Sequence, residues 1–89
     1  MLTKMVCVWY DDTGTPDDPR WVVSVDNVDL ASNETANTTT IEALPSGSDR
    51  SRALAAGRRI AAEKRLPLYE YEPNTNGYAR GNRHTLVCS

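Results

Sequence analysis

Two segments near the start of the chain carry the apolar pattern of β-strands. Residues 4–12 are rich in β-branched and aromatic side chains and are apolar on both faces, which is typical of a central or well-covered strand. In residues 20–28, apolar positions alternate with Ser24 and Asp26, as in a strand with one buried face. Residues 13–19 contain one glycine and two prolines, so we expect a loop that joins the two strands into a hairpin.

Three further strands are predicted in the rest of the chain. Residues 38–44, 68–72 and 83–88 are short runs of strand-forming side chains. The polar residues 29–37 predict a loop, and residues 73–82 predict a turn-rich connection before the last strand.

One helix is predicted between the third and the fourth strand. Ser46 or Ser48 can cap its start, and Asp49 suits the positive end of the helix dipole in the first turn. Pro67 disfavours helical backbone at the residue before it, so the helix should end by Leu66.

The element order β-β-β-α-β-β predicts an α+β fold, in which one helix packs on one face of an antiparallel sheet of about five strands. The 89 residues fit a single small domain, residues 1–89, and a hydrophobic share of 39% supports a modest core. No apolar run approaches the roughly 18 residues of a membrane span, and the apolar start lacks a signal-peptide cleavage site. We therefore expect a cytoplasmic protein.

The predicted helix has one apolar face and two rows of arginine. At 100° per residue, the apolar side chains form a stripe that should face the sheet, made of Ala53, Leu54, Ala56, Gly57, Ile60 and Ala61. Arg52 and Arg59 lie on one flank of the helix, and Arg58 and Arg65 lie on the other.

A strip of small residues, which includes Ala55 and Ala62, separates the two arginine rows. Within the helix, only Glu63 is placed to pair with one of these cations, Arg59. A small-residue strip with cationic edges lets an acidic protein surface, a second copy of the chain or a phosphate backbone approach closely. An ordinary solvated helix face is the alternative interpretation.

The charges are unevenly distributed along the chain. Residues 1–44 carry a net charge of −6 and residues 45–89 a net charge of +4. Either the two halves attract each other within one fold, or an acidic and a basic face each meet a partner. The overall charge of −2 counts against a dedicated nucleic-acid binder. Such a binder would combine the helix cations with exposed tyrosines, but we expect Tyr69 and Tyr71 to pack under the helix.

A second candidate contact region lies around the last predicted turn. Asn76–Gly77 and Gly81 allow positive φ, and Tyr78, Arg80 and Arg83 flank these turn positions. Tyrosine and arginine are enriched at binding hot spots, which favours a contact loop. The alternative is a hairpin whose tyrosine covers the edge of the core.

The sequence offers little support for catalysis or metal binding. His84 is the only histidine, and Cys88 lies four residues beyond it, roughly 13 Å away along a strand. Cys7 and Cys88 stand in no nucleophile or zinc motif, and reduced thiols are expected although a bridge is conceivable. The acids around the first loop lack the ligand spacing of an EF-hand: Asp11, Asp12, Asp17 and Asp18. We expect no enzyme activity, no metal site and no cofactor.

The segments "WVVSV", "RALAAGRRIAAEKR" and "NGYARGNRHT" resemble parts of small uncharacterised bacterial and phage domains. In those domains, a tryptophan-bearing hairpin precedes an alanine-rich helix and a terminal hairpin rich in Gly, Arg and Asn. The present chain differs by the long insertion "DLASNETANTTTIEALPSGS" before the helix. The resemblance implies a similar fold and carries no mechanism.

We therefore expect a small non-enzymatic binding module, similar in class to phage accessory proteins that bind a host protein. Its partner would be a protein with an acidic patch. The expected contact residues are Arg52, Arg58, Arg59, Arg65, Tyr78, Arg80 and Arg83. Nucleic-acid binding by the same cations and a homodimer through the Ala55/Ala62 strip are the alternatives, and no membrane contact is expected.

Overall fold

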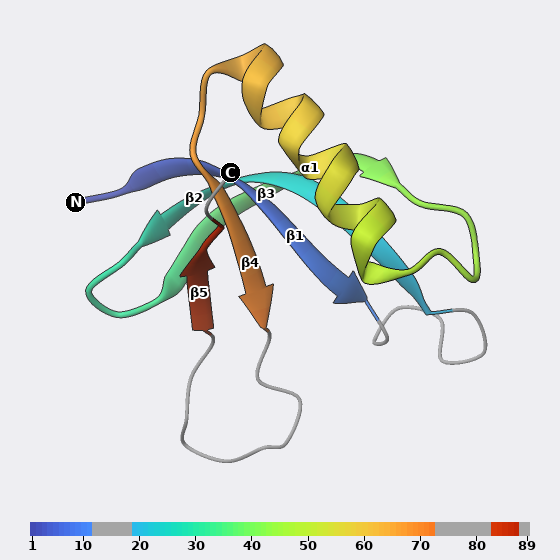
Figure 1. Cartoon of the computed structure of the whole chain (residues 1–89). Helices are drawn as coiled ribbons and strands as arrows, with labels where there is room; N and C mark the ends of the chain where they lie inside the picture. Colours follow the sequence, from blue (N-terminus) through green and yellow to red (C-terminus); the bar gives the residue numbers. More distant parts are fainter. Residues whose placement is uncertain (12–18, 73–82, 88–89) are drawn as a thin grey trace.

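The protein folds into a five-stranded sheet with one helix against one of its faces (Figure 1). The computed structural model describes residues 1–11, 19–72 and 83–87. The elements in chain order are β1 (Thr3–Asp11), β2 (Arg20–Asp29), β3 (Glu34–Ala43), α1 (Arg50–Lys64), β4 (Leu68–Glu72) and β5 (Arg83–Leu86). The α+β class and the predicted order of elements are confirmed.

The sheet is mixed, so the prediction of a wholly antiparallel sheet was wrong. The strand order is β3-β2-β1-β4-β5, and β1 pairs antiparallel with β2 but parallel with β4. The reason lies in the connection through α1. The helix runs back along the sheet, so β4 starts from the same end as β3 and points the same way, as in other strand–helix–strand crossovers. β3 and β1 are themselves parallel, because β2 is antiparallel to both.

The turn between β2 and β3 is much shorter than the loop predicted for residues 29–37. The backbone N–H of Ala31 donates a hydrogen bond of 3.0 Å to Oδ1 of Asp29, which forms a tight local turn. Asn33 completes the turn with φ of 58°, a left-handed conformation that asparagine tolerates. β3 therefore begins at Glu34 and includes the threonine-rich run, whose β-branched side chains suit a strand.

The ends of α1 are fixed by its capping residues. Asp49, rather than Ser46 or Ser48, is the N-cap, and its carboxylate accepts a hydrogen bond of 2.9 Å from the backbone N–H of Arg52. At the other end Arg65 has φ of 55°, and the next residue closes a 3.0 Å hydrogen bond from its N–H to the carbonyl of Ala61. This is the Schellman arrangement, which glycine usually occupies at the left-handed position.

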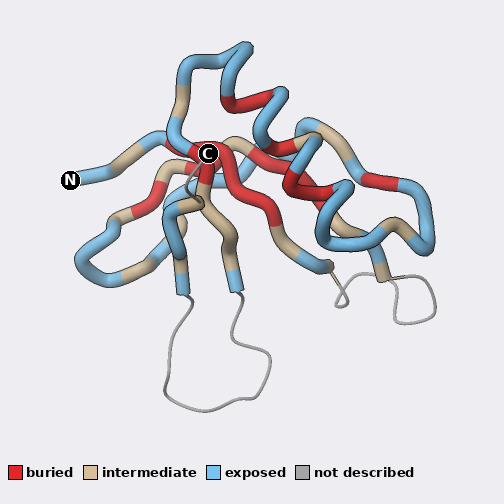
Figure 2. The backbone as a smooth tube through the Cα atoms, in the orientation of Figure 1, coloured by how far each residue is buried: buried red, intermediate tan, exposed pale blue. Residues whose placement is uncertain are grey.

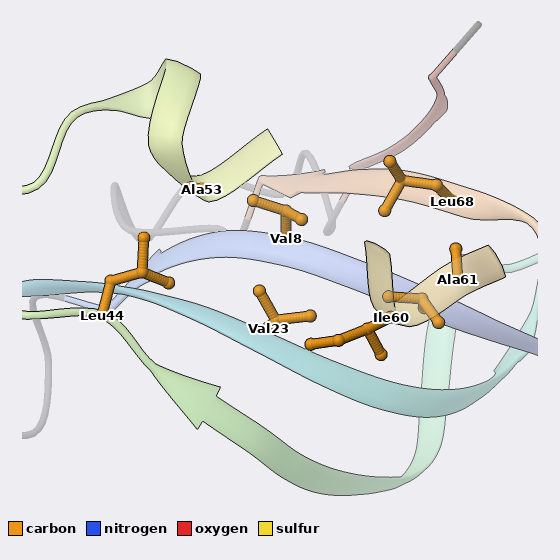
Figure 3. Close-up of a cluster of buried hydrophobic side chains, with 8 residues drawn as sticks. Val8, Val23, Leu44, Ala53, Ile60, Ala61 and Leu68 are labelled. Atoms are coloured by element: carbon orange, nitrogen blue, oxygen red, sulfur yellow. The ribbon is translucent and has the colours of Figure 1, made fainter. Parts of the chain in front are cut away.

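The main hydrophobic core lies between α1 and the sheet (Figure 3). The predicted apolar stripe of the helix is confirmed, with Ala56 half-buried and the other members buried. Figure 2 shows burial running along β1, with buried positions at intervals along α1. Gly57 lies so close to the sheet that an added Cβ would be 2.5 Å from Cγ2 of Val8 and 2.9 Å from Cδ1 of Leu68. The missing side chain at this position therefore sets the distance between helix and sheet.

A second cluster lies on the face of the sheet away from the helix. It comprises Met5, Cys7 and Val28, bordered by Trp9, Tyr69 and Tyr71. The expectation that the two tyrosines pack under the helix was wrong. Leu68 belongs to the helix-side core, and side chains alternate along a strand, so its neighbour Tyr69 points to the opposite face.

Candidate functional site

Two arginines of α1 bind the helix to the sheet through ion pairs. Arg50 makes two contacts with the Glu70 carboxylate, of 2.8 Å from Nε and 2.6 Å from Nη2. These contacts lower the pKa of Glu70 from its ordinary value. Arg59 pairs at 3.1 Å with Glu42 of β3, and not with Glu63 as the helical spacing suggested. The Arg59–Glu42 contact joins the basic and the acidic half of the chain, as expected for halves that attract each other.

The other arginine row borders an apolar groove of about 440 Å³ at the C-terminal end of the helix. Arg58 and Arg65 lie at its edge, and the apolar lining comes from Ala61, Ala62, Leu66, Leu68, Leu86 and Val87. Both arginines are exposed, and neither forms an ion pair within the described ranges. Leu86 is 55% exposed and adds an accessible apolar side chain to the groove.

The structure brings only part of the predicted contact set together. Arg52 is exposed on the opposite flank of the helix from the groove. In the strand register, Arg83 lies opposite Glu72 at one end of the β4–β5 pair. The groove lies at the other end, beside Leu68 and Leu86. Tyr78 and Arg80 lie outside the described residues. Ala55 and Ala62, the proposed dimer strip, are both exposed.

The opposite face of the sheet buries a polar cluster that the sequence analysis missed. Cys7 of β1, Asp26 of β2 and His84 of β5 each direct a potential metal-binding atom to one place, and these atoms lie within 4.8 Å of one another. Cys7 is fully buried and Asp26 is 1% exposed. Alternation in β2 had assigned Asp26 to a solvent-facing side. As a chemical group, His84 had been considered with Cys88, which lies outside the described residues. The signal available in the sequence was the position of Ser24 and Asp26, two polar residues within a valine-rich strand.

One hydrogen bond and one ring contact orient the histidine of this cluster. Nδ1 of His84 lies 3.2 Å from Oδ1 of Asn33, the left-handed residue of the β2–β3 turn. An amide oxygen only accepts, so Nδ1 carries the hydrogen and Nε2 is left with a free lone pair. Tyr71 stacks on the imidazole, with ring centroids 4.7 Å apart. The contact between β5 and the β2–β3 turn shows that the sheet curls, because those segments belong to opposite sides of it (Figure 1).

Two polar atoms of the cluster are buried without a hydrogen-bond partner in the described part of the chain. Oδ1 of Asp26 and Nε2 of His84 both have none. In contrast, the neighbouring buried hydroxyl of Ser24 accepts a hydrogen bond of 3.1 Å from the indole N–H of Trp9. An unsatisfied buried polar atom costs about 1–3 kcal/mol, so the two orphaned atoms weaken the fold.

Burial keeps the thiol and the imidazole of the cluster neutral. Burial raises the pKa of the Cys7 thiol well above its usual range, and the negative charge of Asp26 and a hydrogen bond to it add to the effect. Burial also lowers the pKa of His84, although the nearby Asp26 opposes this change. A protonated and fully buried thiol is poorly suited to nucleophilic attack. A neutral imidazole and a thiol beside a carboxylate are, however, a complete set of metal-binding groups.

No protein-family model, curated protein or solved structure matches this chain. The resemblance to small bacterial and phage domains therefore stays a prediction. Within the described ranges, no helix combines the length and the apolar character needed to cross a lipid bilayer.

Proposed function

We propose that the protein is a small non-enzymatic binding module, whose partner is a protein segment that carries both acidic and apolar side chains. The proposed binding surface is the arginine-edged groove, which we define by Arg58, Arg65 and the apolar lining between α1 and the β4–β5 edge. The observation that carries the proposal is the contrast between paired and unpaired arginines on one helix.

Arg50 and Arg59 are engaged by acids of the sheet, and their role in holding the helix in place is evident from those contacts. Arg58 and Arg65 are exposed, and no described acid binds either of them. A guanidinium at the edge of an apolar surface can bind a carboxylate in a bidentate manner while the apolar surface excludes water from the contact. The groove therefore offers two carboxylate sites beside an apolar floor.

The size of the groove limits what it can hold. A volume of about 440 Å³ lies at the lower end of the range of small-molecule and side-chain pockets. A groove of this volume has room for one or two large apolar side chains. The expected partner segment thus has an apolar anchor between aspartates or glutamates, spaced so that they reach the two arginines.

The proposal is tested by selecting random peptides on the immobilised protein and measuring their affinities in solution. Selected sequences should be enriched in Asp and Glu around an aromatic or leucine anchor. The double variant R58E/R65E should weaken their binding at least about 10-fold, since two charge-assisted contacts become repulsive. R52E is the matched control, because it places the same change on the other flank of the same helix.

Equal loss of binding in R52E and R58E/R65E would mean that only overall charge matters. Selected peptides without acidic residues would contradict the proposal directly. Circular dichroism and thermal unfolding of each variant confirm that the fold is retained, which is expected because all three arginines are exposed.

Two alternative partners are distinguished by simple measurements. Nucleic-acid binding has less support, because the helix cations and the tyrosines of β4 lie on opposite faces of the sheet. It would appear as binding to DNA or RNA in a mobility-shift titration, with an affinity that falls steeply with salt. Dimerisation through Ala55 and Ala62 would give a dimer by light scattering, and Ala55→Glu would disrupt it.

A further inference from the structure

The curled face of the sheet gathers three metal-binding side chains from three separate strands. Cys7, Asp26 and His84 come from β1, β2 and β5, and each offers one ligand atom within 4.8 Å of the other two. In a flat sheet, β2 and β5 would lie roughly 14 Å apart, since two strands separate them in the sheet order. The curl of the sheet and the contact of His84 with the β2–β3 turn bring the side chains together.

We propose that Cys7, Asp26 and His84 bind one divalent transition-metal ion, with Zn²⁺ as the best match. For three atoms no more than 4.8 Å apart, some point lies within about 2.8 Å of all of them, which is close to the 2.0–2.3 Å of zinc bonds to N, O and S. Small rotations of the three side chains close the remaining distance. Water would complete the tetrahedron that zinc prefers.

The orphaned atoms of the cluster are those that a cation would engage. Oδ1 of Asp26 and Nε2 of His84 are buried, and the described residues offer neither of them a partner. Asp26 is 1% exposed, its surroundings include the neutral Cys7 thiol and aromatic rings, and no described lysine or arginine forms an ion pair with it. A metal ion would satisfy both atoms and supply the missing positive charge.

The surroundings of His84 fit a metal ligand as well. Metal-bound histidines commonly donate their second ring N–H to a carbonyl or carboxylate, which fixes the ring and directs the other nitrogen to the metal. Asn33 accepts from Nδ1 in this way, and Tyr71 stacks on the ring. Asn33 is thus a positioning residue and does not itself reach the proposed ion.

The chemistry of the ligands selects among metals. Calcium and magnesium prefer sites made only of oxygen ligands, whereas this cluster offers one sulfur, one nitrogen and one carboxylate oxygen. Such a mixed set is used for zinc, and cobalt(II) can replace zinc as a coloured probe. On binding, the Cys7 thiol would release its proton to solvent and bind the metal as thiolate.

The test is a titration of the reduced full-length protein with Co²⁺, followed by displacement with Zn²⁺. The expected result is one ion per chain, with a sulfur-to-cobalt charge-transfer band and the intense visible bands of tetrahedral cobalt. Zn²⁺ should remove both signals, and Ca²⁺ or Mg²⁺ should not. The chain has a second cysteine, so Cys88→Ser is the matched control and should keep the charge-transfer band, whereas Cys7→Ser should lose it.

Two further variants keep the result interpretable if Cys7→Ser fails to fold. His84→Gln alters a partly exposed residue near the start of β5 and should lower the affinity for Co²⁺ at least about 100-fold. Asn33→Gly keeps the left-handed turn and removes the amide oxygen, and should lower it about 10-fold. Absence of saturable Co²⁺ or Zn²⁺ binding by the wild-type protein would overturn the proposal. Binding unchanged in His84→Gln would overturn it equally.

Discussion

The two faces of the sheet bury their side chains in different ways. The face under α1 is a conventional core of alanine, leucine, isoleucine and valine side chains (Figure 3). The helix approaches the sheet closely at Gly57. The other face has no helix over it in the described structure, yet Cys7, Ser24 and Asp26 are almost completely buried there by the curl of the sheet. One face thus buries apolar groups, and the other also buries a carboxylate.

This difference separates side chains that stabilise the fold, on the helix side, from a buried carboxylate on the other face that needs another explanation. Burial of apolar surface contributes about 25 cal/mol per Å², so the helix-side core needs no explanation beyond stability. A buried carboxylate with an orphaned oxygen lowers stability, and a purely structural role does not account for it. Orphaned buried groups in native proteins commonly mark a binding or catalytic function.

The largest expected effect on stability comes from disrupting the packing of α1 against the sheet. Gly57→Leu places a side chain where even a Cβ would be 2.5 Å from Val8, so the helix must move away from the sheet. We expect a loss of at least about 3 kcal/mol in the free energy of unfolding, measured by urea denaturation. Ala55→Leu, on the exposed side of the same helix, is the control and should change stability little. Equal stability of the two variants would show that the close approach is not needed.

Replacing the buried carboxylate on the other face should raise the free energy of unfolding instead of lowering it. In metal-free protein, Asp26→Val removes a buried carboxylate with one orphaned oxygen and introduces a strand-forming side chain, so we expect a gain of about 1–2 kcal/mol in stability. The same variant should no longer bind Co²⁺. Thermal unfolding with and without metal measures both effects. A clear loss of stability in the metal-free variant would mean that Asp26 holds the fold together.

A smaller effect is expected at the end of the helix, where one residue serves both the fold and the groove. Arg65 has φ of 55°, a conformation that costs a non-glycine residue roughly 1 kcal/mol. Arg65→Gly should therefore raise the free energy of unfolding by about 1 kcal/mol while weakening the selected peptides. Arg58→Gly, inside the same helix, should lower stability by about the same amount. Stabilisation by both changes would point to relief of charge repulsion instead.

The smallest expected effect concerns pH. Arg50 lowers the pKa of Glu70 in the folded state, so this contact stabilises the protein above the unfolded carboxyl pKa of about 4.3. The contribution is lost as pH falls through the still lower folded pKa. Glu70→Gln should thus be less stable than the wild type at pH 7, and the difference should shrink below about pH 4. Thermal unfolding across this range is the measurement. A difference that stays constant with pH would show that the ionised pair is not its cause.

The sequence predicted the elements better than their assembly. The buried stripe of α1 could be found because its period of 3.6 residues is local, and Pro67 marked its end. The parallel pairing of β1 with β4 and the contact of His84 with Asn33 depend on residues far apart in the chain. No local pattern encodes them, although a helix between two strands does favour a parallel crossover.

The candidate sites were predicted unevenly for the same reason. The row of Arg58 and Arg65 follows from helical spacing, but the groove beside it forms only because β5 lies next to the end of the helix. Helical spacing also assigned Arg59 to Glu63, whereas in the fold it pairs with Glu42 of β3. The Cys7–Asp26–His84 cluster was out of reach, because a curled sheet hides a strand face that simple alternation assigns to solvent.

The central claim is that the helix side binds an acidic peptide in the arginine-edged groove, while the opposite face of the sheet binds a metal ion. One nuclear magnetic resonance experiment tests this claim most directly. The uniformly ¹⁵N-labelled protein is titrated first with Zn²⁺ and then with a selected acidic peptide, and backbone amide shifts are followed. We predict that Zn²⁺ shifts the amides of Cys7, Asp26 and His84, and that the peptide shifts those of Arg58, Arg65 and their groove neighbours. Peptide-induced shifts centred on the Cys7 face, or no zinc-induced shifts at all, would contradict the account.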